Sequence, residues 1–161
     1  MNRITNVRIY ARKVARAVGC TMYISCLAHC ILEYIGDFVI CVGPSMEPTI
    51  YSDNIVFAEH LSAQFQKIKR GDIIITQSPF NPKHNICKRV IAIPGDKVRK
   101  GFFSQIVPKG HVWLEGDNKY NSFDSWNYGP VPQGLIRGRV VCRIWPLSQI
   151  KLLTNSTKSN V

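Results

Sequence analysis

Ser45 and Lys88 have residue types and surroundings that suit covalent chemistry. Ser45 follows an apolar run and lies between Pro44 and Met46, where the fixed φ of proline stiffens the turn and presents the serine at a surface. A serine hydroxyl becomes an effective nucleophile when a neighbouring base takes its proton, and a neutral lysine can be that base. Together the two residues predict acyl transfer by a serine hydrolase.

Lys88 begins a segment that alternates as a β-strand, so it shares one face with Val90 and Ala92. An ammonium group among apolar neighbours loses solvation, which lowers the pKa of the lysine and makes it usable as a base near neutral pH. The plainer interpretation is a water-facing lysine on an edge strand. For Ser45 it is a capping serine in a Pro-rich turn, so neither residue carries the prediction alone.

Other catalytic chemistries find less support in the chain. The four histidines stand in no recognisable catalytic motif, and there is neither a GxSxG elbow nor an HExxH metal motif. The six cysteines form no CxxC pair and no zinc-finger spacing, so most are expected to be small buried hydrophobes, although the sequence leaves a disulfide open. We therefore expect no metal and no organic cofactor.

Ser45 and Lys88 lie in or beside short segments of apolar or alternating residues, which are separated by Pro and Gly. Such a pattern predicts a mainly β domain. The expected strands are residues 38–42, 54–58, 72–77, 86–93, 111–115 and 139–145, and residues 61–68 are expected to form a helical turn or a long loop. Residues 116–132 are rich in Gly, Asp, Asn and Ser, which predicts either a surface turn or a polar loop that packs against an active site.

The N-terminal part of the chain differs from the rest. The chain has 161 residues and a net charge of +11, and residues 1–16 are basic and free of acids. Residues 17–36 are apolar and nearly match the roughly 20 residues that a helix needs to cross a bilayer. We therefore assign 1–16 as a basic segment, 17–36 as a membrane anchor, 37–150 as the catalytic domain and 151–161 as a polar tail. A buried amphipathic helix is the alternative, because His29 and Glu33 interrupt the apolar run.

Four motifs follow one another in the catalytic domain: PSMEPT at 44–49, RGDII at 70–74, KRVIAIPGD at 88–96, and GDN with NS, DS and YGPV at 116–131. In this order they resemble the type I signal peptidase family, and most closely its mitochondrial inner membrane members. The short chain, the single anchor and the Arg-rich, acid-free head favour the mitochondrial type. The resemblance implies a signal-peptidase-like β-sheet or barrel preceded by one helix, with no cofactor.

The resemblance also implies the roles of the site residues. Ser45 would attack the scissile carbonyl, Lys88 would be the general base, and the backbone N–H of Ser45 would bind the oxyanion. Ser122 would orient the lysine amine. Asp124 would hold the last motif in place, while Asp117 and Asn118 would shape its loop.

Two positions depart from the family pattern. Some members have a serine two residues before the nucleophile as a further oxyanion donor, and this chain has Gly43 there. The family usually has Arg after its Asp-Ser pair, and this chain has Trp126. Another backbone N–H would have to replace the serine hydroxyl as the second oxyanion donor. The missing arginine would have to be replaced as the partner of Asp124, and the candidates are Arg89, Arg137 and Arg139.

The resemblance implies leader-bearing precursor proteins as substrates, bound as an extended strand along a sheet edge. Residues 38–42 and 88–93 are the candidate edges, and Ile40, Val42 and Met46 are the candidate pocket residues. Also implied are a second family subunit as partner and an inner membrane location, with the active site facing the intermembrane space.

Three alternatives stay open at this point. A bacterial-type signal peptidase would differ in compartment, not in chemistry. A self-cleaving regulator of the SOS-repressor type needs a DNA-binding head, and residues 1–35 show no helix-turn-helix pattern. A non-enzymatic basic protein could use the clusters at 67–70 and 97–100 to bind anionic lipid or nucleic acid, although we expect no nucleic-acid partner.

Overall fold

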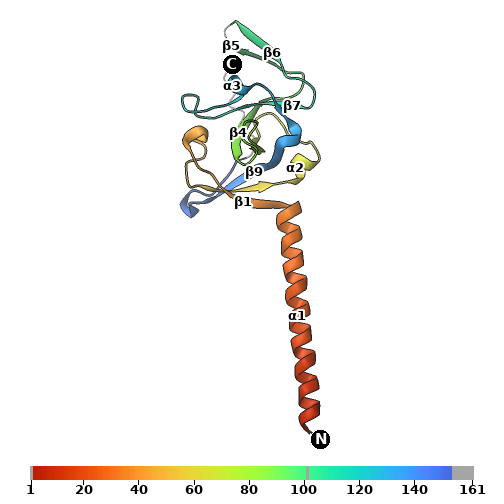
Figure 1. Ribbon diagram of the computed structural model, residues 1–161. Coiled ribbons are helices and arrows are strands. Elements are labelled where there is room, and N and C mark those ends of the chain that lie inside the picture. Colours follow the sequence, from red (N-terminus) through yellow and green to blue (C-terminus); the bar gives the residue numbers. More distant parts are fainter. Residues whose placement is uncertain (1, 101, 154–161) are drawn as a thin grey trace. The chain divides into compact units, whose positions relative to one another are not determined.

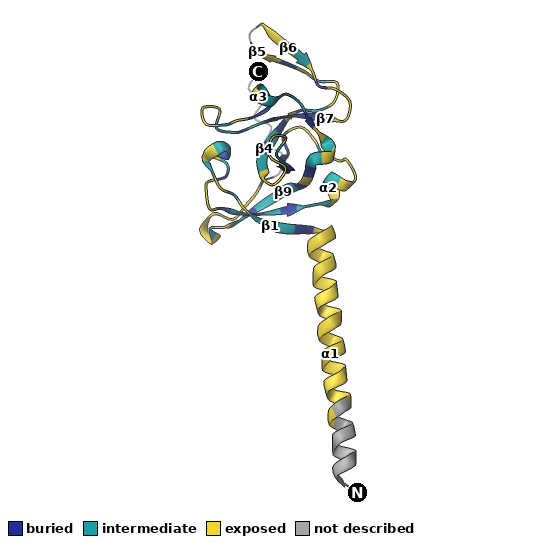
Figure 2. Ribbon diagram, in the orientation of Figure 1, coloured by how far each residue is buried: buried dark blue, intermediate teal, exposed yellow. Residues whose placement is uncertain are grey.

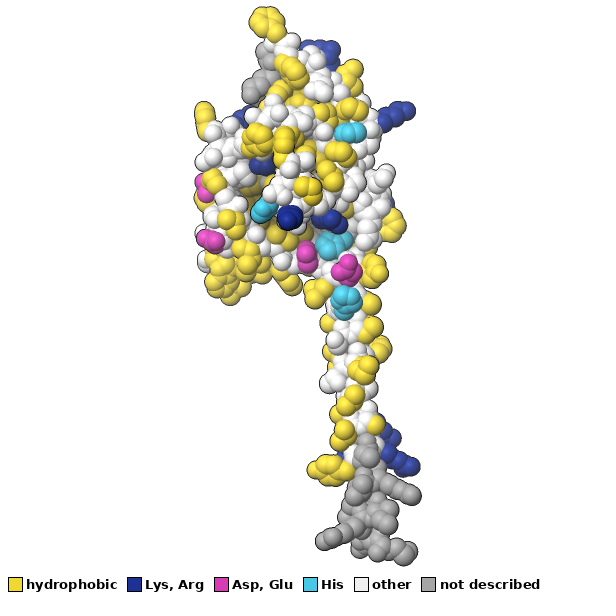
Figure 3. Space-filling view, in the orientation of Figure 1, with side chains coloured by type: hydrophobic (Ala, Val, Ile, Leu, Met, Phe, Trp, Pro, Cys, Tyr) yellow, Lys and Arg dark blue, Asp and Glu magenta, His cyan; other side chains and the backbone are white. Residues whose placement is uncertain are grey.

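The computed structural model describes residues 2–100 and 102–153, which belong to two compact units, Met1–Ile35 and Gly36–Val161. The first unit consists of helix α1 (Asn2–Tyr34), which runs through both the basic segment and the expected anchor. Its Arg12–Tyr34 part has 23 residues and a mean hydropathy of 1.4, and none of its apolar window is buried. Figures 2 and 3 show exposed, largely hydrophobic side chains along it, with Lys and Arg towards its N-terminal end. By length and composition this helix can cross a membrane.

The second unit is built on an antiparallel sheet, which confirms the mainly β prediction (Figure 1). Its strands run in the order β1-β2-β9-β3-β4-β7-β8, and β10 pairs with β9. These strands are β1 (Gly36–Ile40), β2 (Ile55–Glu59), β3 (Ile73–Gln77), β4 (Asn85–Ala92), β7 (His111–Glu115), β8 (Val131–Pro132), β9 (Ile136–Trp145) and β10 (Lys151–Leu152). The long strand β9 therefore lies between β2 and β3, although it comes late in the chain.

Smaller elements complete this unit. Strands β5 (Lys97–Lys100) and β6 (Phe103–Ile106) form a separate hairpin. The helical turn expected within residues 61–68 is α2 (Leu61–Gln64). The remaining short helices are α3 (Ser125–Tyr128) and the 3-10 turns η1 (Pro44–Met46), η2 (Gln133–Leu135) and η3 (Leu147–Gln149). Of the expected polar tail, residues 154–161 lie outside the described part of the chain.

The core follows from the alternation of the strands, and Figure 2 shows it as the dark blue parts of the sheet. On β4, Lys88, Val90 and Ala92 are all buried, as the period-two pattern predicts. Strand β2 alternates in the same way, whereas β3 and β7 are buried on both faces. The buried side chains form three apolar clusters. One cluster contains Met46 and Ile50, so the segment around Ser45 is attached to the core at two points.

The expectation that 88–93 is a free sheet edge is wrong. Strand β4 pairs with β3 through Asn85–Arg89, and with β7 on its other side through Arg89, Val90 and Ala92. Only its first half, from Asn85 to Lys88, lies beyond the pairing with β7. By contrast, β1 ends the strand order of the sheet and pairs with β2 alone among the strands of the described residues. Among the described strands, β1 and the first half of β4 therefore have unpaired edges, and so does β8 at the other end of the strand order.

Candidate active site

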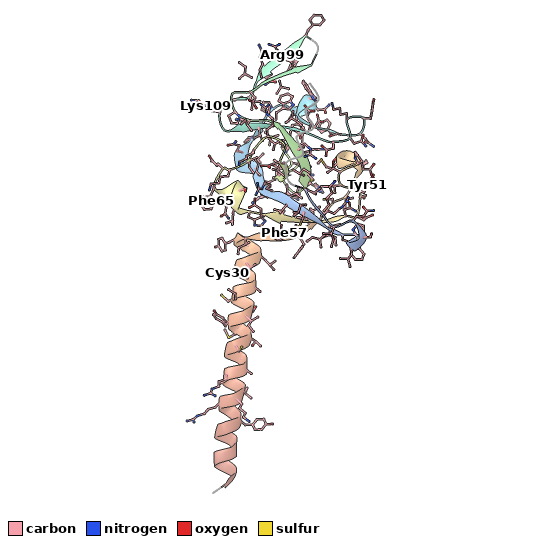
Figure 4. All side chains as sticks on the ribbon, turned by 180° about the vertical axis from the view of Figure 1, so that it is seen from behind. Cys30, Tyr51, Phe57, Phe65, Arg99 and Lys109 are labelled. Atoms are coloured by element: carbon pink, nitrogen blue, oxygen red, sulfur yellow. The ribbon has the colours of Figure 1, made fainter. Side chains whose placement is uncertain are left out.

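The chain turns sharply at Ser45. Pro44 begins the short helix η1, and Glu47 N donates a hydrogen bond to Pro44 O at 3.2 Å, which closes the turn. Met46 is buried in the core, whereas Ser45 is half-buried. Figure 4 labels Tyr51 in the loop that follows this turn. The proline and the buried methionine thus fix the backbone on both sides of the serine.

Lys88 is only 4% exposed. Its Nζ donates a hydrogen bond to Ser122 Oγ at 2.9 Å. Burial lowers the pKa of Lys88 by removing water from the ammonium form, and it prevails over the carboxylate of Asp124 and the neighbouring Cys87, which act in the opposite direction. The pKa of Lys88 is therefore lowered, as expected from the sequence, and burial is the cause.

Ser45 and Lys88 line one cavity of about 130 Å³. The cavity lies between the segment that contains the end of β1 and the first half of β4. Its other lining residues are Val39, Ile40, Cys41, Val42, Gly43, Met46, Ile50, Ile75, Asn85, Ile86 and Cys87. The structure thus brings together the two residues of the expected dyad and all three of the expected pocket residues.

The polar loop after β7 packs against the Ser45 turn. Asn118 N donates to Ser45 O at 3.1 Å, and Asn118 Nδ2 donates to Pro44 O at 3.2 Å. A Cβ on Gly116 would lie 2.5 Å from Ser45 O and would also collide with the hydroxyl of Ser122. Gly116 therefore packs closely against both the serine turn and Ser122, the residue that binds Lys88. The sequence interpretation missed this glycine, whose only signal was its position at the start of the polar motif.

Asp124 is buried and caps helix α3. Its carboxylate accepts hydrogen bonds from Trp126 N at 3.1 Å and from Gly116 N at 3.3 Å, while Asp124 N donates to Asn127 Oδ1 at 3.1 Å. This is a capping box, in which side chain and backbone satisfy each other's polar groups. Asp124 thereby fixes both the start of α3 and the amide of Gly116.

Two of the three arginine candidates for Asp124 have other partners. Arg89 makes a two-pronged ion pair with Asp117, with nitrogen–oxygen distances of 2.7 and 2.6 Å. Arg139 Nε donates to Glu59 at 2.9 Å, and Arg137 is exposed. Among the described residues, none of the three arginines is paired with Asp124. The negative charge of Asp124 is instead stabilised by backbone N–H groups.

Asp117 and Trp126 gain definite contacts in the structure. Asp117 ties the polar loop to Arg89, which follows Lys88 on β4, and Arg89 Nη1 also donates to Gly71 O at 2.8 Å. Trp126 stacks edge-on against Trp113, with ring centroids 4.9 Å apart, and contacts Phe103 of the β5–β6 hairpin. An aromatic contact thus occupies the position where the family usually has arginine.

A family model described as "Signal peptidase, peptidase S26" matches residues 14–101 and 99–145 of this chain. The chain belongs to this peptidase family. It is 56% identical over 150 residues to mitochondrial inner membrane protease subunit 1 of Homo sapiens, covering 89% of this chain and 90% of that protein. The corresponding protein of Xenopus tropicalis is 48% identical over 161 residues, covering 96% of both chains.

More distant S26 relatives match as well. Mitochondrial inner membrane protease subunit 2 of Mus musculus is 40% identical over 122 residues, covering 68% of this chain and 70% of that protein. A solved signal peptidase I from Enterococcus faecalis V583 is 25% identical, with a TM-score of 0.40, and covers 45% of this chain and 95% of that one. The family assignment rests on the sequence relatives.

Family membership confirms the expected class of enzyme: this S26 chain is a serine endopeptidase of the signal peptidase type. With one N-terminal helix that is apolar enough to span a bilayer, it is a membrane signal-peptidase-like protease. The regulator and the non-enzymatic binding protein are therefore set aside as interpretations. The mitochondrial relatives favour the mitochondrial type over the bacterial one.

The close approach at Gly116 gives a direct test of this S26 site. We expect Gly116→Ala to push the polar loop away from Ser45 and Ser122, and to lower kcat/KM on a leader-bearing peptide by roughly 100-fold, the scale of an ångström-sized misplacement. Gly134→Ala is the matched control, because nothing lies within 4 Å of its added Cβ. Circular dichroism checks that both variants stay folded. Full activity in a folded Gly116→Ala variant would contradict the packing described above.

Proposed function

We propose that this S26 peptidase removes leader peptides from precursor proteins by a Ser45–Lys88 dyad. The observation that carries the proposal is the buried amine of Lys88, which lines the same cavity as Ser45 and has a lowered pKa. Lys88 takes the proton of Ser45 as Oγ attacks the scissile carbonyl, and it then gives that proton to the leaving amine. Water hydrolyses the acyl-enzyme in a second step, with the same base.

Ser122 and Asp124 act as positioning residues in this scheme. Ser122 accepts a hydrogen bond from Nζ of Lys88, which fixes the amine in the cavity. Asp124 accepts a hydrogen bond from the amide of Gly116, a residue that packs closely against both Ser122 and the carbonyl of Ser45. Asp117 and Asn118 extend this arrangement, because Asn118 donates two hydrogen bonds to the turn that carries the nucleophile.

The oxyanion forms beside the backbone N–H of Ser45, which we assign as one donor. Gly43 cannot supply a side-chain hydroxyl, so a second backbone N–H of the cavity completes the hole. Loss of one such donor typically costs about 10²–10³ in kcat. A second donor is therefore needed for an efficient reaction.

The substrate binds as an extended strand between residues 39–42 and the first half of β4. Both segments line the cavity, and β1 and the first half of β4 each have an unpaired edge. Cys41 already bonds to Asn54 and Asp53 through its backbone, so pairing with a substrate would use the neighbouring backbone groups. Ile40 and Val42 are 63% and 84% exposed, whereas Met46 is buried at 3%. Ile40 and Val42 would contact the substrate from the open side, and Met46 would support the base of the pocket.

We place the protein in the mitochondrial inner membrane, with its active site facing the intermembrane space. The relatives named as inner membrane proteases support this membrane. The basic start of α1 supports the orientation, because basic residues beside a membrane helix favour the inner side and leave the C-terminal domain on the outer side. A second family subunit is the proposed partner, since relatives named subunit 1 and subunit 2 both match this chain.

The anchor has a separate test. The full chain, expressed in mitochondria, should stay in the membrane pellet after extraction with alkaline carbonate, because Arg12–Tyr34 is long and apolar enough to span the bilayer. A chain that begins at Gly36 should appear in the supernatant. Release of the full chain by carbonate would contradict the anchor.

The dyad is tested by removing each group in turn. Ser45→Ala removes the nucleophile, and Lys88→Met keeps the apolar stem but removes the base. We expect each to lower kcat on a leader-bearing peptide by at least about 10³-fold. Because residues that act as a unit are not additive, the double variant should be no worse than the poorer single one.

Ser104→Ala and Lys97→Met are matched controls, since both residues belong to the β5–β6 hairpin and neither lines the cavity. Both should keep the activity of the unmodified chain. If Ser45→Ala and Lys88→Met also kept it while the protein stayed folded, the proposed dyad would be wrong.

The pH dependence tests the role of Lys88 as the base. Activity should rise with pH as the amine loses its proton, with a midpoint in kcat/KM below the usual pKa of a lysine because burial lowers it. Asp124 raises the pKa of Lys88, so Asp124→Asn should move the midpoint to lower pH. Asparagine remains a good helix cap, but it can accept only one of the two amide hydrogen bonds of Asp124, so circular dichroism must show that the variant is folded.

Asp37→Asn is the control for charge, because Asp37 is not among the groups that shift the pKa of Lys88. Its profile should overlay that of the unmodified protein. A midpoint that moves upwards in Asp124→Asn would show that the titrating base is not Lys88.

A further inference from the structure

A pair of cysteines lies beside the proposed dyad. Cys41 directly follows β1, and Cys87 precedes Lys88 on β4. Both are half-buried, both line the cavity that contains Ser45, and both pack against the core cluster of Met46 and its neighbours. The pKa of Cys41 is lowered and that of Cys87 is raised by a side-chain interaction between the two thiols, which line the same cavity from two different segments. A disulfide needs the two Cα atoms within about 7 Å of each other, and the shared cavity lining and the interaction between the two thiols are consistent with that separation.

We propose that Cys41 and Cys87 form a reversible disulfide that closes the candidate active site. The reagent would be a disulfide, either a small molecule or a protein, that exchanges with this thiol pair. The closure of the site rests on the proposed function, whereas formation of the bond does not.

The local chemistry assigns an order to the two thiols. Cys41 accepts the hydrogen bond from Cys87, which lowers the pKa of Cys41, whereas this interaction and burial raise the pKa of Cys87. The Cys41 thiolate therefore attacks the reagent disulfide first and forms a mixed disulfide, with release of one reagent thiol. Cys87 then loses its proton and attacks Sγ of Cys41, which releases the second reagent thiol. Two protein thiols are oxidised, and one reagent disulfide is reduced to two thiols.

The bond would connect the two segments between which the substrate strand is proposed to lie. Bridged sulfurs sit about 2.05 Å apart, closer than two thiols in van der Waals contact. This draws residue 41 towards β4 and narrows the cavity that Ser45 lines. The oxidised protein should therefore exclude the side chain of the substrate that enters this cavity.

The other described cysteines lie elsewhere. Cys20, Cys26 and Cys30 are exposed on α1, and Cys142 is on β9. None of these four lines the cavity. Cys142→Ser therefore removes a half-buried thiol outside the site and is the matched control for Cys41→Ser and Cys87→Ser.

The experiment uses the full chain in detergent, incubated with oxidised glutathione and then digested without reductant. We expect mass spectrometry to find a Cys41–Cys87 cross-linked peptide in the unmodified chain and in Cys142→Ser, but in neither Cys41→Ser nor Cys87→Ser. Cleavage of a leader-bearing peptide should be lost on oxidation and should return with dithiothreitol. Each variant is compared with its own rate under reducing conditions.

The possible outcomes separate the bond from its effect. Glutathione attached to Cys41 without any Cys41–Cys87 peptide would overturn the disulfide. A complete cross-link with unchanged cleavage would overturn the closure of the site. The cross-link is also measured in Ser45→Ala, where no proteolysis is needed, so a failure of the proposed dyad leaves the result on the disulfide readable.

Discussion

The burial of one amine is the constraint on which the site depends. Lys88 lies on the inward face of β4, where an ammonium ion loses most of its hydration. Each unit by which its pKa falls corresponds to about 1.4 kcal/mol of lost preference for the charged form. The sheet supplies this energy through the packing of the same face, where Val90 and Ala92 are buried together with Lys88. The basicity of the lysine is therefore a property of the strand.

The alternation of β4 could be read from the sequence, and so could most of the strands. A period-two pattern needs no knowledge of neighbouring strands, so it predicted which face of β4 is buried. It could not say which strands lie beside β4. The wrong expectation of a free edge at 88–93 shows this limit, because β7 pairs there after a connection that contains the β5–β6 hairpin.

The polar contacts of the site were less accessible to sequence reasoning. The roles expected for Ser122 and Asp124 came from the family resemblance, since neither residue has a local signal of its own. The contact between Cys41 and Cys87, and the ion pair between Arg89 and Asp117, join segments far apart in the chain. Such contacts depend on the strand order, in which β9 separates β2 from β3. No local pattern fixes that order.

Trp126 shows how the site tolerates the loss of the usual arginine. A buried carboxylate needs hydrogen-bond donors, and Asp124 receives them from the amides of Gly116 and Trp126. An ion pair is then not required to keep the charge buried, and the side chain of Trp126 packs against Trp113. The substitution has an electrostatic consequence, because a cation near Asp124 would partly cancel its effect on Lys88. With backbone amides as its partners, Asp124 opposes the desolvation of the lysine more strongly. Burial therefore lowers the pKa of Lys88 against the opposing effects of Asp124 and Cys87.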